Sequence, residues 1–496
     1  MSEIRTRIAP SPTGFAHVGT LRSALYNFLF AKKNNGKFIL RIEDTDQSRL
    51  VPGAMEDVVK VLEEFGLTND EGPRWIDNKI EEVGQFGPYQ QSKRLDIYKK
   101  YAEELISGKH AYYCFCTPER LEELRKSQEA QKKAPKYDKH CLNLTQEEIS
   151  NRLDSGERHV IRLNVPVAQT IKFNDLVHGE VSISTNDIDD QVLLKSDGFP
   201  TYHLAVVIDD HLMNITHVLR GDEWMPSTPK HILLYKAFGW ELPIYGHLPL
   251  LLSRTRKKLS KREGDVAVRE FLAQGYLSEA LLNFIAFLGW NPKTEREIFS
   301  LDELVQEFKI ENVNKAGAVF DLDKLDWING QYIRQLSAEE LHKRIEPYLM
   351  DANLNYENYA KEFIQKVLTL EQGRLKKLSE IGERVRYFFE DPNYEAEMLI
   401  WKKSNKEDSQ KNLQALYTKI QEIPNDKLQK DFLETEIKNY LTENNIETGN
   451  ALWPLRVALS GLSASPSPFE IMDAFGVLSN GKDIILRRIN SAIEKL

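Results

Sequence analysis

The first part of the chain contains two short apolar runs that flank a longer stretch with helical spacing. The first run ends before Pro10, which lacks the N–H group that the interior of a strand needs. Apolar residues then recur at the spacing of one helix face: Leu21, Ala24, Leu25, Phe28 and Leu29. The nearly continuous apolar run 38–42 predicts a buried strand. The pattern therefore predicts strand, loop, helix and strand over residues 7–46.

Glycines mark the turns of this unit. Gly14 and Gly19 let the backbone approach a ligand closely, and Thr20 is suited to the N-cap of the helix. Gly36 is suited to the left-handed position after the helix ends. Free N–H groups and the helix dipole favour a phosphate at the helix start, where His17 can donate a hydrogen bond. A His-x-Gly sequence alone fits equally well a Pro/Gly turn with a surface histidine.

The longer sequence resembles a known family. The segment His17-Val18-Gly19-Thr20 resembles the HIGH signature of class I aminoacyl-tRNA synthetases, and segments 7–14 and 41–46 resemble the glutamate-specific branch. The helical spacing that prevails after residue 337 is similar to that of its bacterial type. This resemblance implies an α/β Rossmann-like catalytic core with an α+β insertion, followed by an all-α C-terminal half. It also implies ligation of L-glutamate to tRNA(Glu) through a glutamyl-adenylate, with release of AMP and diphosphate.

The same resemblance implies roles for individual residues. Catalytic roles fall on His17, Thr20, Lys258 and Lys261. Glutamate would be bound by Arg7, Ala9, Ser11, Glu43, Tyr202 and Arg220. ATP would be bound by Gly14, His17, Gly19, Glu223 and Lys261. Arg374 lies where the family reads the tRNA anticodon.

The charges of these residues suit a dicarboxylic amino acid. The run 215–219 predicts a buried strand that ends at Arg220, and the carboxyl ends of parallel strands bind ligands. A buried Arg220 needs an anion, and Arg7 after the first strand would share the substrate carboxylate in a bidentate pair. Glu43 would bind the α-ammonium. One departure is Val206, where some relatives have an asparagine.

A second basic segment lies in the middle of the chain. Six of the nine residues 254–262 are basic, which on its own is typical of a solvated charge run. The segment Lys258-Leu259-Ser260-Lys261-Arg262 resembles the KMSKS loop, with Leu for Met and Arg for the last Ser. Such a loop neutralises the leaving diphosphate, a role expected first of Lys261 and then of Lys258. The chain has no Walker-type phosphate loop, so we expect attack on the α-phosphate of ATP, with Mg²⁺.

All three cysteines lie in one region. Cys114 and Cys116 on an extended turn, with Cys141 returned by a helical excursion, fit three corners of a tetrahedral zinc site. Some relatives carry zinc here. The fourth ligand is left open between Tyr137, which a close branch uses, and His140, because the position of a family histidine is taken by Asn143. The alternative is three reduced, buried cysteines without metal.

An adjacent acidic pair, Asp209-Asp210, is followed by His211. Such a pair could hold a metal or serve as a general acid and base. We favour a structural role, in which the acidic pair orients groups near the site, and we expect the same of His211.

Length and composition are consistent with this organisation. The resemblance divides the 496 residues into a Rossmann core, first half (1–90), an acceptor-end-binding insertion (91–190), the second half of the core (191–256), a KMSKS and stem-contact domain (257–335) and an α-helical anticodon-binding region (336–496). The net charge of −9 excludes no local basic face. The polar start, the lack of long apolar runs and the few cysteines predict a cytoplasmic protein without membrane contact, and we expect a monomer.

Three other functions compete with this interpretation. A glutaminyl ligase is disfavoured by Arg220 and by the helical spacing that prevails after residue 337. A non-catalytic tRNA-binding paralogue would not need His17 and Lys261. A small-molecule adenylyltransferase would share a His-x-Gly sequence but would not need residues 337–496.

Overall fold

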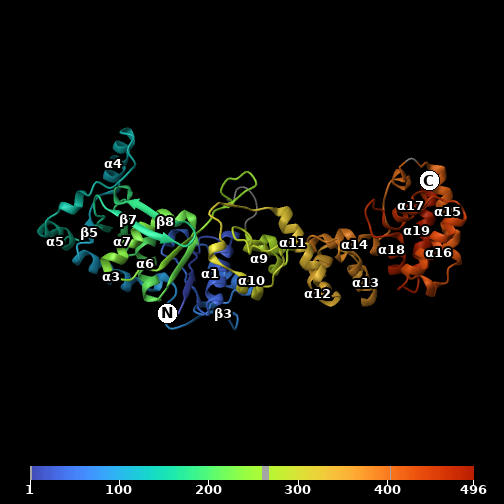
Figure 1. Cartoon of the computed structure of the whole chain (residues 1–496), viewed down its shortest axis with the longest axis horizontal. Helices are drawn as coiled ribbons and strands as arrows, with labels where there is room; N and C mark the ends of the chain where they lie inside the picture. The colour runs from blue at the N-terminus through green and yellow to red at the C-terminus, as the bar shows by residue number, and fades with distance from the viewer. Residues whose placement is uncertain (1–2, 260–266, 403) are drawn as a thin grey trace. The chain divides into compact units, whose positions relative to one another are not determined.

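The protein is described by a computed structural model that places residues 3–259, 267–402 and 404–496 (Figure 1). The chain divides into two compact units. One unit comprises Met1–Phe271 with Ser278–Leu322, and the other comprises Leu272–Leu277 with Asp323–Leu496. In the described parts, no helix is long and apolar enough to cross a membrane.

The first unit begins with the β-α-β arrangement that the hydrophobic pattern predicts. It consists of β1 (Arg5–Ile8), α1 (Val18–Lys33) and β2 (Lys37–Leu40). The two strands are parallel, with Arg7 opposite Ile39. The apolar face of α1 is buried as expected, at Leu21, Ala24, Leu25, Phe28 and Leu29.

Two local expectations about α1 are wrong. The helix is capped by His17 and not by Thr20, because the His17 side chain accepts the backbone N–H of Thr20. At the other end, Asn35 takes the left-handed conformation, with φ 54°, and Gly36 does not. Gly36 is needed for a different reason, since a Cβ there would lie 2.1 Å from the carbonyl oxygen of Ile4.

The second half of the nucleotide fold follows after the insertion. It is built from α6 (Tyr202–Leu212), β10 (His217–Gly221), α7 (Thr228–Phe238) and β11 (Ile244–Leu248). Strands β10 and β11 are parallel. The N–H of Thr216, just before β10, donates to the carbonyl of Arg5 at 3.0 Å, which brings β10 beside β1. The strands therefore run in the order β2, β1, β10, β11, and the carboxyl ends of β1, β2 and β10 meet at one edge of the sheet, where α/β folds bind ligands.

After β2 the chain forms α2 (Ala54–Glu64), β3 (Gly72–Ile76) and β4 (Lys79–Val83), which precede the insertion expected at 91–190. The insertion is α+β, as expected, and comprises α3 (Leu95–Ser107), β5 (Ala111–Cys114), α4 (Pro118–Ala130), α5 (Gln146–Asp154), β6 (Val160–Leu163), β7 (Thr170–Asp175) and β8 (Gly179–Ser184). Strand β9 (Val192–Leu194) follows it. Strands β5, β6 and β9 form their own antiparallel sheet. The β7–β8 hairpin instead extends the core sheet, because Asp175 of β7 pairs with Tyr245 of β11.

The chain after β11 first adds short helices and strands and then becomes entirely helical. The elements up to residue 319 are β12 (Leu251–Leu252), α8 (Val268–Ala273), α9 (Ser278–Ala286), α10 (Leu301–Glu307) and β13 (Ala318–Val319). The later helices are α11 (Leu322–Gln335), α12 (Ala338–Asp351), α13 (Lys361–Gln372), α14 (Ile381–Phe389), α15 (Lys406–Glu422), α16 (Lys430–Glu443), α17 (Thr448–Ser460), α18 (Pro468–Phe475) and α19 (Gly481–Lys495) (Figure 1). The described residues after Val319 form no strand, which confirms the all-α C-terminal half.

The corrected end of α1 leads to a stability prediction. Gly36→Ala should lower the melting temperature, because its Cβ would collide with the Ile4 carbonyl beside β1. Asn35→Gly should leave it unchanged or raise it slightly, because glycine adopts positive φ without strain. Thermal unfolding followed by circular dichroism measures both, and equal melting temperatures for the two variants would contradict the assignment.

Candidate active site

A cavity of about 570 Å³ opens at the edge where β1, β2 and β10 end. It is lined by the residues that the sequence analysis expected to bind glutamate and ATP or to act in catalysis, with the exception of Lys261. These residues are Arg7, Ala9, Ser11, Gly14, His17, Gly19, Thr20, Glu43, Tyr202, Arg220, Glu223 and Lys258. These residues come from segments that lie up to 251 positions apart in the sequence. Lys261, with Ser260 and Arg262, lies outside the described residues.

A buried network of ion pairs supports one wall of the cavity. Asp210 of α6 accepts hydrogen bonds from Arg7 Nε at 3.0 Å and from Arg41 Nη1 at 2.7 Å. Arg41 Nη2 in turn donates to Glu43 Oε1 at 2.9 Å. Burial by itself would raise the pKa of Asp210, but the guanidinium groups of Arg7 and Arg41 outweigh burial and hold the pKa below its usual value. Asp210 therefore remains an anion that fixes both arginines.

The structure agrees with the structural role expected of the acidic pair. The neighbouring Asp209 accepts hydrogen bonds from Gln91, from Arg94 and from the hydroxyl of Tyr98, each at 2.8 Å. Neither aspartate lines the cavity. His211 is likewise remote from it and stacks on Trp240, with ring centroids 3.7 Å apart.

Arg7 presents unused donors to the cavity. Its Nε atom is engaged by Asp210, whereas the described part of the chain offers no recorded partner to its two terminal nitrogens. The side chain is almost completely buried, yet it lines the cavity. A guanidinium held by one nitrogen, with its other edge directed at a cavity, suits bidentate binding of a carboxylate.

Glu43 supplies the opposite charge nearby. Only its Oε1 atom is engaged, by Arg41, among the contacts recorded in the described ranges. Burial raises the pKa of the Glu43 carboxyl, and the neighbouring Arg41 and Arg7 offset part of that rise. Its second oxygen is therefore available to a cationic group such as an ammonium.

Arg220 is held in a different way from Arg7. Its guanidinium donates to the Tyr202 hydroxyl at 2.9 Å and to the Thr228 hydroxyl at 2.8 Å. Its other contacts are His247 at 3.1 Å, His231 at 3.3 Å and the Trp224 carbonyl at 3.3 Å. Neutral groups thus satisfy the donors of Arg220 in this structure, which the sequence argument did not foresee. No carboxylate of the described residues pairs with it, so its charge stays available to an anion.

The Tyr202 hydroxyl contacts Arg220, and both residues line the cavity. It accepts a hydrogen bond from Arg220, so its own proton can be donated to a ligand. Burial raises the pKa of Tyr202, with Arg220 opposing that rise, and the group stays a neutral donor. Val206, the departure from some relatives, is buried and does not line the cavity.

The phosphate loop places His17 at the start of α1. His17 Nδ1 accepts the backbone N–H of Thr20 at 3.1 Å, so a neutral ring carries its proton on Nε2. Nε2 lies 3.2 Å from Thr20 Oγ1, and the ring is exposed at the cavity. His17 therefore caps the helix through Nδ1, and its Nε2–H, 3.2 Å from Thr20 Oγ1, lies at the helix N-terminus, where an anion is favoured.

Two aromatic side chains at the cavity were not expected from the sequence. Phe15 and Trp224 both line it and are 53% and 40% exposed. Exposed aromatic rings at a cavity offer faces on which a planar ring can stack. A lone aromatic residue in a loop carries no pattern, so the sequence had no signal for either one.

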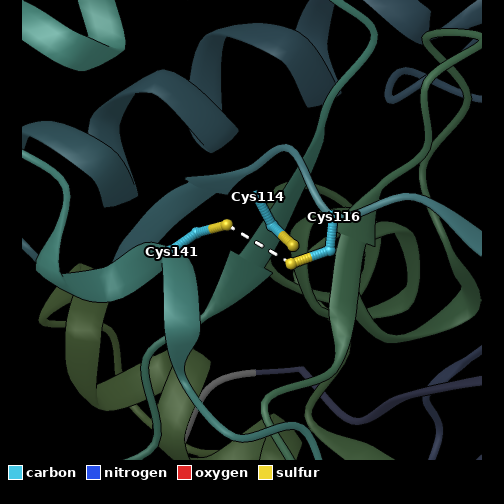
Figure 2. Close-up of side chains that lie close together, drawn as sticks. All are labelled: Cys114, Cys116 and Cys141. Atoms are coloured by element: carbon cyan, nitrogen blue, oxygen red, sulfur yellow. Dashed lines mark hydrogen bonds between the residues drawn. The ribbon is translucent and has the colours of Figure 1, made fainter. Parts of the chain in front are cut away.

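The three cysteines converge at the end of β5, as their spacing predicts (Figure 2). Their sulfur atoms all lie within 4.8 Å of one another, and Cys116 Sγ is 3.5 Å from Cys141 Sγ. Tyr137 Oη lies 3.4 Å from Cys114 Sγ and 3.2 Å from Cys116 Sγ. Of the two candidate fourth ligands, Tyr137 thus joins the sulfurs, and the exposed His140 is not part of the cluster.

The cluster fits a tetrahedral ion. With Zn–S of about 2.3 Å and Zn–O of about 2.0 Å, the edges of such a site are about 3.5 to 3.8 Å. The Cys116–Cys141, Tyr137–Cys114 and Tyr137–Cys116 separations agree with these edges to within a few tenths of an ångström, and the other sulfur pairs lie within 4.8 Å. The hydrogen bond that Cys114 and Cys141 share lowers the pKa of the Cys114 thiol, with further hydrogen bonds from Tyr137 and Arg162, and it raises the pKa of the Cys141 thiol. Metals bind the thiolate form of cysteine.

In the helical unit, Arg374 follows α13 in a turn. Its backbone N–H donates to the Glu371 carbonyl at 2.9 Å. The side chain is exposed, and no side-chain hydrogen bond or ion pair is recorded for it among the described residues. An exposed guanidinium plane of this kind can stack on an unpaired base.

Two family descriptions match the chain. The description "tRNA synthetases class I (E and Q), catalytic domain" matches residues 3–327, and "Anticodon binding domain" matches residues 340–493. Curated relatives match over nearly the full length. A glutamate–tRNA ligase of Clostridium acetobutylicum is 46% identical and covers 100% of this chain and 99% of its own, and that of Chloroherpeton thalassium is 45% identical with the same coverage.

Solved structures agree with these matches. The chain is similar to a glutamate tRNA ligase from Elizabethkingia meningosepticum, solved in complex with its amino acid, with a TM-score of 0.88 and 36% identity. That similarity covers 99% of both chains. A glutamate-tRNA synthetase from Elizabethkingia anophelis gives a TM-score of 0.87, also at 36% identity, and covers 99% of this chain.

The ion-pair network leads to a prediction about stability and pH. Asp210→Asn should lower the free energy of unfolding by about 3 kcal/mol at pH 7, because it leaves two buried guanidinium groups without their shared anion. Since the folded pKa of Asp210 lies below its ordinary value of 3.8, its stabilisation is present above that pH and disappears as the pH falls through the folded pKa. The difference between the two proteins should therefore shrink below about pH 4.

Urea unfolding at several pH values measures this difference. Glu81→Gln is the control, because the pair that Glu81 forms with Lys79 is exposed and its loss should change the free energy by less than about 1 kcal/mol. Equal losses for the two variants at pH 7 would contradict a structural role for Asp210.

Proposed function

This chain belongs to the class I tRNA synthetases specific for glutamate and glutamine, and we propose that it ligates L-glutamate to tRNA(Glu). In the first step, the α-carboxylate of glutamate attacks the α-phosphate of ATP and forms glutamyl-adenylate and diphosphate. In the second, a terminal ribose hydroxyl of the tRNA attacks the activated carbonyl and releases AMP. No protein side chain needs to act as a nucleophile, so the catalytic contribution is positioning and charge stabilisation.

One observation supports glutamate most strongly. Arg7 has an unengaged guanidinium edge in the cavity, and Arg220 in the same cavity touches no carboxylate among the described residues. Two such cations match the side-chain carboxylate of glutamate, whereas glutamine would leave them without a countercharge. Unpaired buried groups of this kind discriminate between substrates by on the order of 10⁴.

The remaining groups are proposed to orient the amino acid. The free oxygen of Glu43 would bind the α-ammonium, and the Tyr202 hydroxyl would donate to a carboxylate. Ser11 and Ala9 line the same cavity and would complete the pocket with a hydroxyl and with backbone groups.

The ATP site is proposed at the start of α1. Gly14 and Gly19 leave room for the phosphates, and the helix N-terminus attracts their charge. His17 Nε2–H would donate to a phosphate oxygen in place of Thr20 Oγ1 as charge develops, and the backbone N–H of Thr20 holds the ring through Nδ1. Glu223 would bind ATP, and Lys258 and Lys261 would neutralise the diphosphate. Mg²⁺ bound with ATP would supply further neutralisation of the phosphates.

The tRNA is proposed to use the other parts of the chain. Residues 91–190 would grip its acceptor end, residues 257–335 its stem, and residues 336–496 its anticodon. Within the last region Arg374 would stack on or hydrogen-bond an anticodon base. We propose that the protein acts as a monomer in the cytoplasm.

The function is tested by charging tRNA(Glu) and tRNA(Gln) transcripts with glutamate and with glutamine. We expect glutamate to be attached to tRNA(Glu) and glutamine to neither tRNA. Arg7→Met should lower kcat/KM for glutamate by about 10² to 10³, because charged hydrogen bonds to the substrate are lost. Arg296→Met is the matched control, since that arginine is exposed and pairs with Glu303 outside the cavity.

The charging assay, together with ATP–diphosphate exchange measured with and without tRNA, separates the competing functions. Attachment of glutamine would identify a glutaminyl ligase. ATP–diphosphate exchange that ignores tRNA would favour a small-molecule adenylyltransferase, and tRNA binding without exchange or charging would identify a non-catalytic paralogue. Each of these results would contradict the proposal.

We also propose that Cys114, Cys116, Tyr137 and Cys141 hold a structural zinc ion, the first and third of the cysteines being buried. The ion would replace the close sulfur contacts with four bonds and would tie β5 to the segment after α4. It would take no part in the reaction, because the cluster does not line the cavity.

The zinc proposal is tested by elemental analysis of the purified chain. About one zinc per chain is expected, with much less in Cys141→Ser, whose melting temperature should fall. Tyr137→Phe should weaken zinc binding, whereas His140→Ala should retain the metal. Zinc-free protein with three reduced thiols and unchanged stability would reject the site.

A further inference from the structure

Arg220 has a set of partners on the side away from the cavity. His247 of β11 and Thr228 of α7 contact its guanidinium, but neither residue lines the cavity. Both are completely buried. The orientation of Arg220 therefore depends on groups that a bound substrate would not touch.

The contacts of His247 determine its tautomer. Nδ1 lies 2.6 Å from Asp175 Oδ2. Nε2 lies 3.1 Å from Arg220 Nε and also 3.1 Å from the Thr228 hydroxyl, which can donate or accept. An ionised carboxylate only accepts hydrogen bonds and a guanidinium only donates them. The proton of His247 must therefore be on Nδ1, and the lone pair of Nε2 must face Arg220.

Asp175 is itself fixed by the backbone. Its Oδ1 atom accepts N–H groups of Val177 and His178 at 3.0 Å each and of His247 at 3.2 Å. Burial alone would raise the pKa of Asp175, but the hydrogen bonds from His247 and from these amides outweigh it and lower the pKa. The carboxylate stays ionised, and only Oδ2 remains to select the tautomer of His247.

We propose that His247 and Asp175 are positioning residues for glutamate, holding Arg220 through a neutral imidazole that accepts its Nε–H. This inference rests on the proposed function. Asp175 sets the tautomer, His247 presents a lone pair, and Arg220 is thereby directed at the cavity. Because the acceptor is neutral, Arg220 is oriented without the direct ion pair that would compete with a substrate carboxylate.

The arrangement contrasts with that of Arg7. Arg7 is oriented by the carboxylate of Asp210, which also serves Arg41. At Arg220 the imidazole ring of His247 separates the guanidinium from the carboxylate of Asp175, so the two charged groups make no direct contact. A simple packing role for His247 would require a group of similar size but not one with a lone pair at this position.

The test compares three variants of the full-length protein in tRNA charging. His247→Gln retains an acceptor near the position of Nε2, and its KM for glutamate should stay within about threefold of wild type. His247→Leu fills the space without an acceptor and should raise KM for glutamate about tenfold or more, because Arg220 is left with an unsatisfied donor. KM for ATP should change by less than about threefold in both. His211→Leu, at a histidine remote from the cavity, is the matched control and should behave as wild type.

Asp175→Asn tests the tautomer separately. Asparagine has one side-chain oxygen, whereas Asp175 uses two. The amide N–H of the asparagine would therefore face His247 Nδ1, and the imidazole proton would move to Nε2, where it would face the N–H donor of Arg220. Nitrogen-15 shifts of the imidazole, assigned by comparison with His247→Gln, should show Nδ1–H in the wild type and a shift toward Nε2–H in Asp175→Asn. KM for glutamate should rise as it does in His247→Leu.

Several results would overturn the inference. Equal KM values for glutamate in His247→Leu and His247→Gln would do so, as would a parallel rise in KM for ATP or an Nε2–H tautomer in the wild type. A wild-type protein that charges no tRNA with glutamate would instead overturn the proposed function. The nitrogen-15 shifts of the wild type and of Asp175→Asn do not depend on charging or on His247→Leu. They therefore decide whether the imidazole is an acceptor for Arg220 even if the wild type is inactive or His247→Leu does not fold.

Discussion

The carboxylate of Asp210 is the contact on which the geometry of the cavity depends. It belongs to α6, yet it holds Arg7 at the end of β1 and Arg41 just after β2. A buried anion between two buried cations satisfies all three charges, and a different placement of any one would leave an unpaired charge in the interior. The ion pair therefore connects the two halves of the nucleotide fold at the edge where the cavity opens.

Because Asp210 uses only one nitrogen of Arg7, the same contact that stabilises the fold also directs the rest of that guanidinium into the cavity. Arg41, which Asp210 also holds, donates to one carboxylate oxygen of Glu43, and the other oxygen of Glu43 has no recorded partner among the described residues. Stability and substrate recognition thus share the same buried charges, and a substitution in this network is expected to affect both.

The inserted segment is part of the support for the cavity as well as a region with a sheet of its own. Its β7 strand pairs with β11 and carries Asp175 to the rear of the cavity wall, where His247 links it to Arg220. Its other sheet carries Cys114 and brings Tyr137 to the three sulfurs. One segment therefore supports the wall of the cavity at one end and forms a candidate metal site at the other.

The sequence alone determined the class of fold and the chemistry at the ends of the strands. The helical spacing of α1, the apolar runs of β1 and β2, and the polar residues that follow them are local features, and local patterns are set by the periods of helices and strands. The spacing of the cysteines likewise predicted their convergence, because a short turn and one helical excursion return the chain to the same place.

Only the tertiary structure decided which groups pair. Asp210 lies 203 residues from Arg7, and Asp175 lies 72 residues from His247, so neither pairing leaves a periodic signal in the sequence. The choice of Tyr137 over His140 depended on which side chain faces the sulfurs, and the cap of α1 depended on the rotamer of His17. Each of these outcomes requires the register of strands and the direction of side chains, which exist only once the chain has packed.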